Sequence, residues 1–252
     1  YGTTIVETSE NYGEISYPQF TTYAECLKTD GTDIGDIVLL SDIKMGGLIG
    51  EAGNYDYTKN LIITNSYNAG NIVGGLGYGT YGMEEPSVRV GGLVGDTDAL
   101  NVFVDNSYNI GSFSINAEGT IPTDKLQAQE IENTYFVAGG LFGYLQSGRT
   151  DSYTDENGNY VSGQSDINPK VEIHDSFNGG NIEFHNTSYF ALVGGFVGWN
   201  KAQFMNVVNS YSFGDLSVTG ALTALSDSEI GPMFSSGILT GAFVGVGVCS
   251  VT

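Results

Sequence analysis

The chain has 252 residues, of which 40% are hydrophobic, so it is long enough and apolar enough to bury a core. Its 29 acidic residues against 8 basic ones give a formal net charge of −21, which excludes nucleic acid and anionic membrane surfaces as favourable partners. Glycine is abundant at 37 residues, but five prolines and the lack of a Gly-X-Y period exclude collagen. No apolar stretch is long enough for membrane insertion as a spanning helix.

The N-terminal region precedes the regular part of the sequence. The chain begins at Tyr1 without an initiator Met or a basic segment followed by an apolar one, as expected of a processed or excised form. Residues 17–36 fall outside any repeat, and we predict that they cap the end of a repetitive core. Three acids lie among glycines here, and oxygen-rich loops suit calcium, so they are calcium candidates. These candidates are Asp30, Asp33 and Asp36.

Two short motifs then alternate along the chain. A glycine unit at 45–50 returns at 90–95, 138–143, 193–198 and 240–245, and an Asn-Ser-Tyr unit at 63–72 returns at 104–113, 173–182 and 208–216. A further copy of the second unit opens the chain at 6–15. Successive glycine units start 45, 48, 55 and 47 residues apart. The distance from one motif to the next predicts coils of about 20–25 residues, two per repeat and about eleven in all.

This self-similarity predicts an all-β fold, a right-handed parallel β-helix (a β-solenoid) that forms a single domain over residues 1–252. Each coil would place equivalent strands above one another, with Leu or Val inside and glycine or Asn at the corners. Equivalent side chains would then stack as ladders. We predict an aromatic stack of Tyr67, Tyr108, Phe177 and Tyr211, and an amide ladder that includes Asn65, Asn106 and Asn209.

The paired units Gly-Gly-Leu-Val-Gly and Asn-Ser-Tyr-x-x-Gly-x-Ile resemble the GLUG motif over roughly residues 43–245, with the partial copy at 6–15. That motif occurs in bacterial extracellular proteins, including adhesin-like proteins and regions attached to secreted immunoglobulin-A-type metallopeptidases. The resemblance implies an extracellular or cell-surface location, a role in cell adhesion and membership of a larger polypeptide. It implies no particular activity.

The longest interruption of the repeats is the insertion at 144–170. Residues 153–161 alternate around an Asn-Gly pair, which predicts a β-hairpin that projects from the solenoid. Loops on rigid scaffolds often carry binding function, so Tyr153, Tyr160 and also Trp199 are binding candidates. A tolerated insertion without function is the alternative. Asp155, Asn157 and Asn159 are further calcium candidates near the hairpin tip, and no cofactor other than calcium is predicted.

Residue types needed for catalysis are scarce. His174 and His185 are the only histidines, and His174 occupies a repeat position filled elsewhere by Thr or Asp, which predicts an outward-facing side chain. No His-Glu-x-x-His zinc motif occurs. Arg89 is interpreted as isolated. Asp96 and Asp98 would face one side of a strand and are interpreted as surface acids rather than a catalytic carboxylate pair.

The sequence therefore predicts a non-enzymatic bacterial cell-surface or secreted module, adhesin-like or part of a stalk. Its expected partner is a host or bacterial surface protein or a glycan. One alternative is a glycan-active enzyme on a β-helix scaffold, which would need a wall lined by several carboxylates. The other is an accessory region of a larger secreted peptidase.

Overall fold

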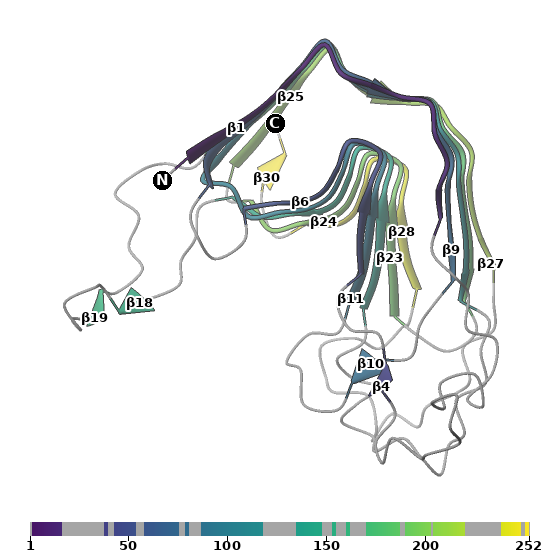
Figure 1. Ribbon diagram of the computed structural model, residues 1–252. Coiled ribbons are helices and arrows are strands. Elements are labelled where there is room, and N and C mark those ends of the chain that lie inside the picture. Colours follow the sequence, from purple (N-terminus) through teal and green to yellow (C-terminus); the bar gives the residue numbers. More distant parts are fainter. Residues whose placement is uncertain are drawn as a thin grey trace.

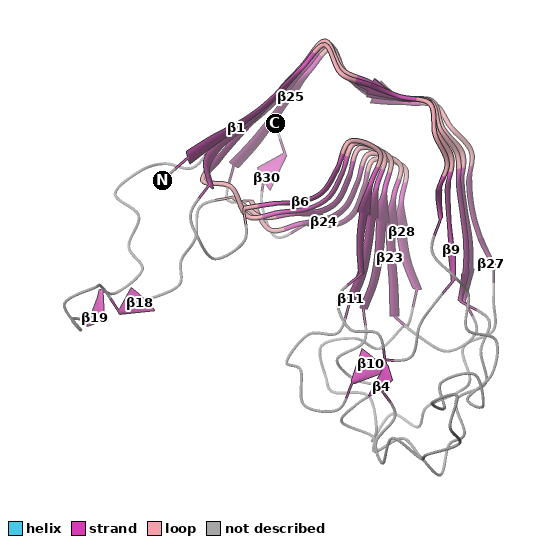
Figure 2. Ribbon diagram, viewed as in Figure 1, coloured by secondary structure: helices cyan, strands magenta, loops and turns pink. Residues whose placement is uncertain are grey.

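The computed structural model describes most of the repetitive part of the chain. The described residues are 2–16, 38–39, 43–53, 58–75, 79–80, 87–117, 135–147, 153–154, 160–161, 170–186, 190–202, 204–219, 238–247 and 250–251. They form strands and turns without a helix, which confirms the predicted all-β class (Figure 2). No helix long and apolar enough to cross a lipid bilayer is found among them. The predicted N-terminal cap at 17–36 lies outside these residues.

Five parallel sheets build a solenoid, and the chain visits them in the same order in every coil (Figure 1). Sheet 1 contains β1 (Gly2–Glu7), β7 (Thr58–Thr64), β13 (Asn101–Asp105), β20 (Val171–His174), β25 (Phe204–Val208) and β30 (Ser250–Val251). Sheet 2 contains β2 (Glu10–Asn11), β8 (Tyr67–Asn68), β14 (Tyr108–Asn109), β21 (Phe177–Asn178) and β26 (Tyr211–Ser212). Sheet 3 contains β3 (Ile15–Ser16), β9 (Ile72–Gly75), β15 (Phe113–Ala117), β22 (Ile182–Asn186) and β27 (Leu216–Thr219).

The remaining two sheets are made by the glycine units. Sheet 4 contains β5 (Ile43–Gly46), β11 (Ser87–Gly91), β16 (Tyr135–Gly139), β23 (Phe190–Gly194) and β28 (Ile238–Gly241). Sheet 5 contains β6 (Ile49–Ala52), β12 (Val94–Thr97), β17 (Phe142–Leu145), β24 (Val197–Asn200) and β29 (Val244–Gly247). Two antiparallel pairs lie outside the stack: β4 (Val38–Leu39) with β10 (Gly79–Thr80), and β18 (Tyr153–Thr154) with β19 (Tyr160–Val161).

The strand register corrects the predicted coil length of about 20–25 residues. Equivalent serines in successive coils are separated by 57, 41, 69 and 34 residues, so each coil contains a whole repeat. Sheets 2 to 5 each hold five strands, which gives five coils among the described residues instead of about eleven. The prediction failed because the two motifs do not stack on each other. They form different walls of one coil, and each stacks only on its own copies, as Gly46 does on Gly91.

The glycine corner between sheets 4 and 5 explains why those motifs face each other. A Cβ on Gly47, Gly92 or Gly140 would lie 2.3–2.4 Å from the side-chain Cγ of an Asn on sheet 2. Only glycine therefore lets the corner reach across the coil to the opposite wall. This contact divides the interior into two hydrophobic cores, one between sheets 1 and 5 and one between sheets 3 and 4. Phe142 and Ile173 lie in the first core, and Phe136 and Phe184 in the second.

A left-handed residue followed by a serine turns the chain from sheet 1 into sheet 2. Asn65 has a φ of 50° and Asn106 a φ of 44°, as expected for Asn at a corner. Thr8, Asp175 and Asn209 occupy the same position in the other coils. The next residue is always Ser, whose backbone N–H donates to the Ser Oγ of the next coil at 3.0–3.2 Å.

On the outer side of this region the predicted aromatic stack is confirmed, and the predicted amide ladder is confirmed between Asn65 and Asn106, whereas Asn209 Nδ2 donates to Asp175 Oδ1 instead. Rings 67, 108 and 177 stack with centroids 4.8 and 4.6 Å apart, and ring 211 continues the stack at 5.5 Å. Asn106 Nδ2 donates to Asn65 Oδ1 at 2.8 Å. A second, buried amide ladder was not predicted: Asn68 Nδ2 donates to Asn109 Oδ1, and Asn109 Nδ2 to Asn178 Oδ1, both at 2.8 Å. The solenoid is thus held by continuous side-chain ladders on both sides of sheet 2.

The predicted hairpin is present within the insertion at 144–170. Tyr153 pairs with Val161 and Thr154 with Tyr160 in an antiparallel arrangement. β18 and β19 lie apart from the stacked coils in Figure 1. The insertion enters between sheets 5 and 1 of the third coil, so it interrupts the connection between sheets without breaking any of them.

Candidate functional site

Charged and aromatic side chains follow one wall of the stack where sheets 4 and 5 meet. On sheet 4, the strand positions between core residues hold Lys44 and Arg89, which are neighbours in register. On sheet 5, the residue after the last glycine of each unit forms a matching column. This column holds Glu51, Asp96, Tyr144 and Trp199. We call these residues, together with Lys201, the charged–aromatic strip.

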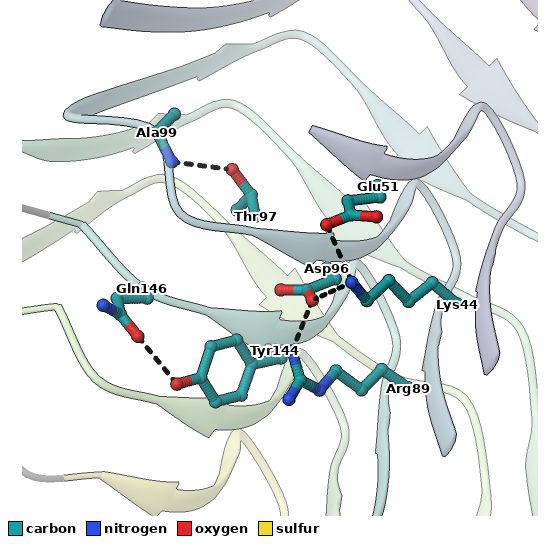
Figure 3. Close-up of polar contacts among 8 residues, drawn as sticks. All are labelled: Lys44, Glu51, Arg89, Asp96, Thr97, Ala99, Tyr144 and Gln146. Carbon is teal, nitrogen blue, oxygen red and sulfur yellow. Dashed lines mark hydrogen bonds and ion pairs between the residues drawn. The ribbon is translucent and has the colours of Figure 1, made fainter. Parts of the chain in front are cut away.

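The N-terminal half of the strip is an ion-pair network centred on Asp96 (Figure 3). Arg89 Nη1 pairs with Asp96 Oδ2, and Lys44 Nζ lies 3.5 Å from the same oxygen. Lys44 Nζ also pairs with Glu51 Oε1 at 2.7 Å. Burial raises the pKa of Asp96, whereas the charges of Arg89 and Lys44 lower it, and burial has the larger effect. Asp96 is only 5% exposed, so the network closes this part of the wall.

The C-terminal half of the strip is aromatic. The guanidinium carbon of Arg89 lies 4.4 Å from the centroid of the Tyr144 ring, which joins the two halves. Tyr144 and Trp199 meet edge to face at 5.4 Å, and the Tyr144 hydroxyl donates to Gln146 Oε1 at 2.7 Å. Lys201 Nζ lies 4.2 Å from the Trp199 ring and 5.3 Å from the Tyr144 ring. Trp199 and Lys201 are half-buried, so a ligand can reach both.

The strip corrects two sequence interpretations. Asp96 was expected to be a surface acid beside Asp98, but it is buried within the network, because sheet 4 packs against sheet 5 at this point. Asp98 follows the end of β12, and its carboxylate lies over Gly53. Arg89 was interpreted as isolated and instead pairs with Asp96 seven residues later in the sequence.

The predicted binding residues do not form one site. Trp199 lies in the strip, whereas the backbone of Tyr153 and Tyr160 belongs to the separate hairpin. The calcium candidates Asp30, Asp33, Asp36, Asp155, Asn157 and Asn159 lie outside the described residues. Within the part of the chain that the structure describes, no group of three or more His, Cys, Asp or Glu side chains gathers as metal ligands would.

The histidine prediction is confirmed. The side chain of His174 is 43% exposed on the outer face of sheet 1, with Nε2 3.2 Å from Glu172 Oε2. His185 contacts Thr219 on sheet 3. Neither histidine belongs to the strip.

Sequence reasoning missed all of the strip except Trp199, although a signal was present. A basic residue directly precedes the first glycine unit and an acid directly follows it, at Lys44 and Glu51. The same pair of flanking charges recurs around the second glycine unit, at Arg89 and Asp96. Alignment of the positions that flank the glycine units, rather than the units alone, would have placed these charges in one column.

Comparison with protein-family models, with curated proteins and with solved structures finds no match for this chain in any of the three. The resemblance to the GLUG motif therefore stays an interpretation of the repeated units. The parallel solenoid itself rests on the strand register.

Proposed function

We propose that this chain is a non-enzymatic module of a bacterial cell-surface or secreted protein, adhesin-like or part of a stalk, that binds a protein or a glycan. The observation that carries the proposal is the half-buried Trp199 with Lys201 on a wall of stacked, ladder-bonded coils. Aromatic rings beside a cation on a rigid scaffold suit recognition, because little conformational entropy is lost when a ligand binds. An adhesin-like module would present such a site outside the cell.

Binding of the fluorescently labelled chain to a glycan array and to bacterial and host cells tests this proposal. We expect selective binding that falls at least tenfold in Trp199→Ala, since aromatic anchors dominate such interfaces. Tyr211→Ala is the matched control, because Tyr211 is an exposed ring on sheet 2. Absence of binding to every glycan and every cell type would refute the proposal.

A glycan-active enzyme is the second candidate, and one observation favours it. Glu51 and Asp96 are register neighbours on adjacent strands, whose backbones lie about 5 Å apart, and Lys44 Nζ contacts both carboxylates. A retaining glycosidase likewise uses two neighbouring carboxyl groups. The raised pKa of Asp96 would suit a general acid. Release of reducing ends from a polysaccharide panel, abolished in Glu51→Gln, would establish this activity. If the panel stays intact in the presence of the unmodified chain, this candidate fails.

A further inference from the structure

Lys201 differs from the other basic residues of the charged–aromatic strip. Lys44 is paired with Glu51, and Arg89 with Asp96. Among the described residues, no carboxylate lies within ion-pair distance of Lys201. Its ammonium group instead contacts the rings of Trp199 and Tyr144. This cation is therefore available to an anionic group of a ligand.

The backbone fixes the position of this lysine. Lys201 N donates to Leu145 O of the preceding coil at 2.8 Å, and Ala202 N donates to Asn200 Oδ1 at 3.0 Å. From this fixed backbone position the Lys201 ammonium group lies over the Trp199 and Tyr144 rings. A ligand that meets Lys201 here finds a charge already in place, so less ordering entropy is lost on binding.

The strongly acidic chain does not prevent an anion from binding at this point. The Debye length at physiological ionic strength is about 8 Å, so exposed carboxylates farther away are largely screened. The acids nearest in the strip, Glu51 and Asp96, are already paired with cations. Three of the eight basic residues of the chain lie in the strip, and they outnumber its two acids.

We propose that Trp199 and Lys201 recognise a sugar ring that bears a carboxylate, such as a uronic or sialic acid residue of a glycan; this inference rests on the proposed binding function. The exposed part of the indole supplies an apolar surface for the C–H face of the ring, and Lys201 beside it takes the carboxylate in a charge-assisted hydrogen bond. Nearby, the half-buried Gln146 amide, whose Oε1 accepts from the Tyr144 hydroxyl, supplies a polar group suited to sugar hydroxyls. An acidic peptide would need the cation but not this apolar surface, which is why we favour a sugar.

Fluorescence titration tests the inference directly, because Trp199 is the only tryptophan of the chain. The probes are sialyllactose and glucuronic acid as acidic sugars, lactose as the neutral sugar, and an oligo-aspartate peptide. We expect the acidic sugars to change the Trp199 emission and to bind about tenfold more tightly than lactose or the peptide. Lys201→Gln should remove this preference, and Lys201→Arg should keep it. Lys170→Gln is the matched control, since Lys170 is exposed at the start of sheet 1.

The outcomes separate the inference from the proposed function. Equal binding of lactose and sialyllactose, unchanged in Lys201→Gln, would overturn the carboxylate assignment and leave glycan binding standing. Tight binding of the peptide would overturn the assignment to sugar. If none of the four probes binds while cells still bind in a Trp199-dependent way, the inference fails and the proposed function survives. The thermal unfolding of each variant confirms that a lost response reflects the site rather than the fold.

Discussion

At the scale of single residues, the buried asparagines of sheet 2 stabilise the stack more directly than the visible outer ladders. Asn109 donates to Asn178 and to Gly111 O and accepts from Asn68, so its amide joins three coils. Asn68 and Asn178 make the same kind of contacts within their own coils. Because these amides are fully buried, water cannot replace a lost partner.

Asn109→Ala should lower the free energy of unfolding by about 2–4 kcal/mol, because it leaves buried donors and acceptors without partners. Asn71→Ala is the control: Asn71 is exposed and accepts one hydrogen bond, from Ser112 N, which water can replace, so the loss should stay below about 1 kcal/mol. Urea denaturation followed by circular dichroism measures both. Equal losses in the two variants would contradict the role of the buried ladder.

Asp96 makes stability depend on pH in a direction set by its burial. In the folded protein its pKa is raised above about 3.9, the ordinary value that it has in the unfolded chain. At a pH between the unfolded-state pKa and the folded-state pKa, the folded protein therefore binds more protons than the unfolded chain. The contribution of Asp96 to the free energy of unfolding is therefore lost as the pH rises through that range. The free energy of unfolding of the unmodified chain, minus that of Asp96→Asn, should fall as the pH rises above about 4, the ordinary carboxyl pKa.

Denaturant melts of both forms at several pH values provide the measurement, with Asp105→Asn as an exposed carboxylate control. A difference that rises with pH would mean that the attraction of Arg89 and Lys44 exceeds the cost of burial. The ion pairs would then stabilise the strip more than its desolvation destabilises it.

At the scale of elements, the corner between sheets 4 and 5 is the contact that sets the shape of the coil. A Cβ on Gly140 would come within 2.1 Å of Gly195 O and 2.4 Å of Asn178 Cγ. The Gly195 backbone lies on one side and the hydrogen-bonded Asn178 amide on the other, so the corner cannot shift to make room for a Cβ. The two cores exist as separate bodies because this corner touches sheet 2.

Gly140→Ala should destabilise the chain by more than about 4 kcal/mol or prevent folding altogether. Gly13→Ala is the matched control, because its Cβ would meet only Asn11 Oδ1, at 3.5 Å. Thermal unfolding by circular dichroism distinguishes the two variants. If Gly140→Ala had the same melting temperature as Gly13→Ala, the corner could not be in contact with the opposite wall.

The strands and corners also show which parts of the fold and of the strip could be predicted from the sequence. The aromatic stack was predictable, and so was part of the outer amide ladder, since aromatic and Asn side chains recur at fixed offsets from the glycine at the end of each motif. Coil length was not, because a periodic sequence does not say whether two unlike motifs stack or face each other. The charged half of the strip was missed because its charge pair occurs in only two copies. Val137 with Tyr144, and Leu192 with Trp199, replace it in the next two coils.

At the scale of the whole molecule, variation in coil length is confined to the two connections that flank sheets 4 and 5. The segment from the serine that precedes sheet 2 to the first residue of sheet 3 has the same length in all five coils, as from Ser66 to Ile72. Between sheets 5 and 1, four residues separate Thr97 from Val102 but twenty-five separate Leu145 from Val171, its register equivalent. The solenoid is constant along one side and variable along the other.

Replacement of residues 146–170 by the four-residue sequence of 98–101 should therefore preserve the fold, with a melting temperature within a few degrees of the unmodified chain. The fourth coil makes the same step from Asn200 to Met205 with four residues between them. Thermal unfolding checks the expectation, and unfolding of the variant at room temperature would refute it. The same variant removes Tyr153 and Tyr160 together with Gln146, the hydrogen-bond partner of Tyr144 in the strip, so unchanged binding would show that the hairpin does not contribute, and a loss would need Gln146→Ala alone for comparison.

The constancy of the serine-to-sheet 3 segment has a genetic consequence. In-frame DNA breakpoints within the same variable connection of two repeats join one complete coil to another, because that connection tolerates different lengths. Unequal recombination between repeats can then add or delete a coil in frame while every ladder stays in register. Descendants of such a gene can differ in the number of coils, and hence in reach, without passing through an unfolded intermediate form.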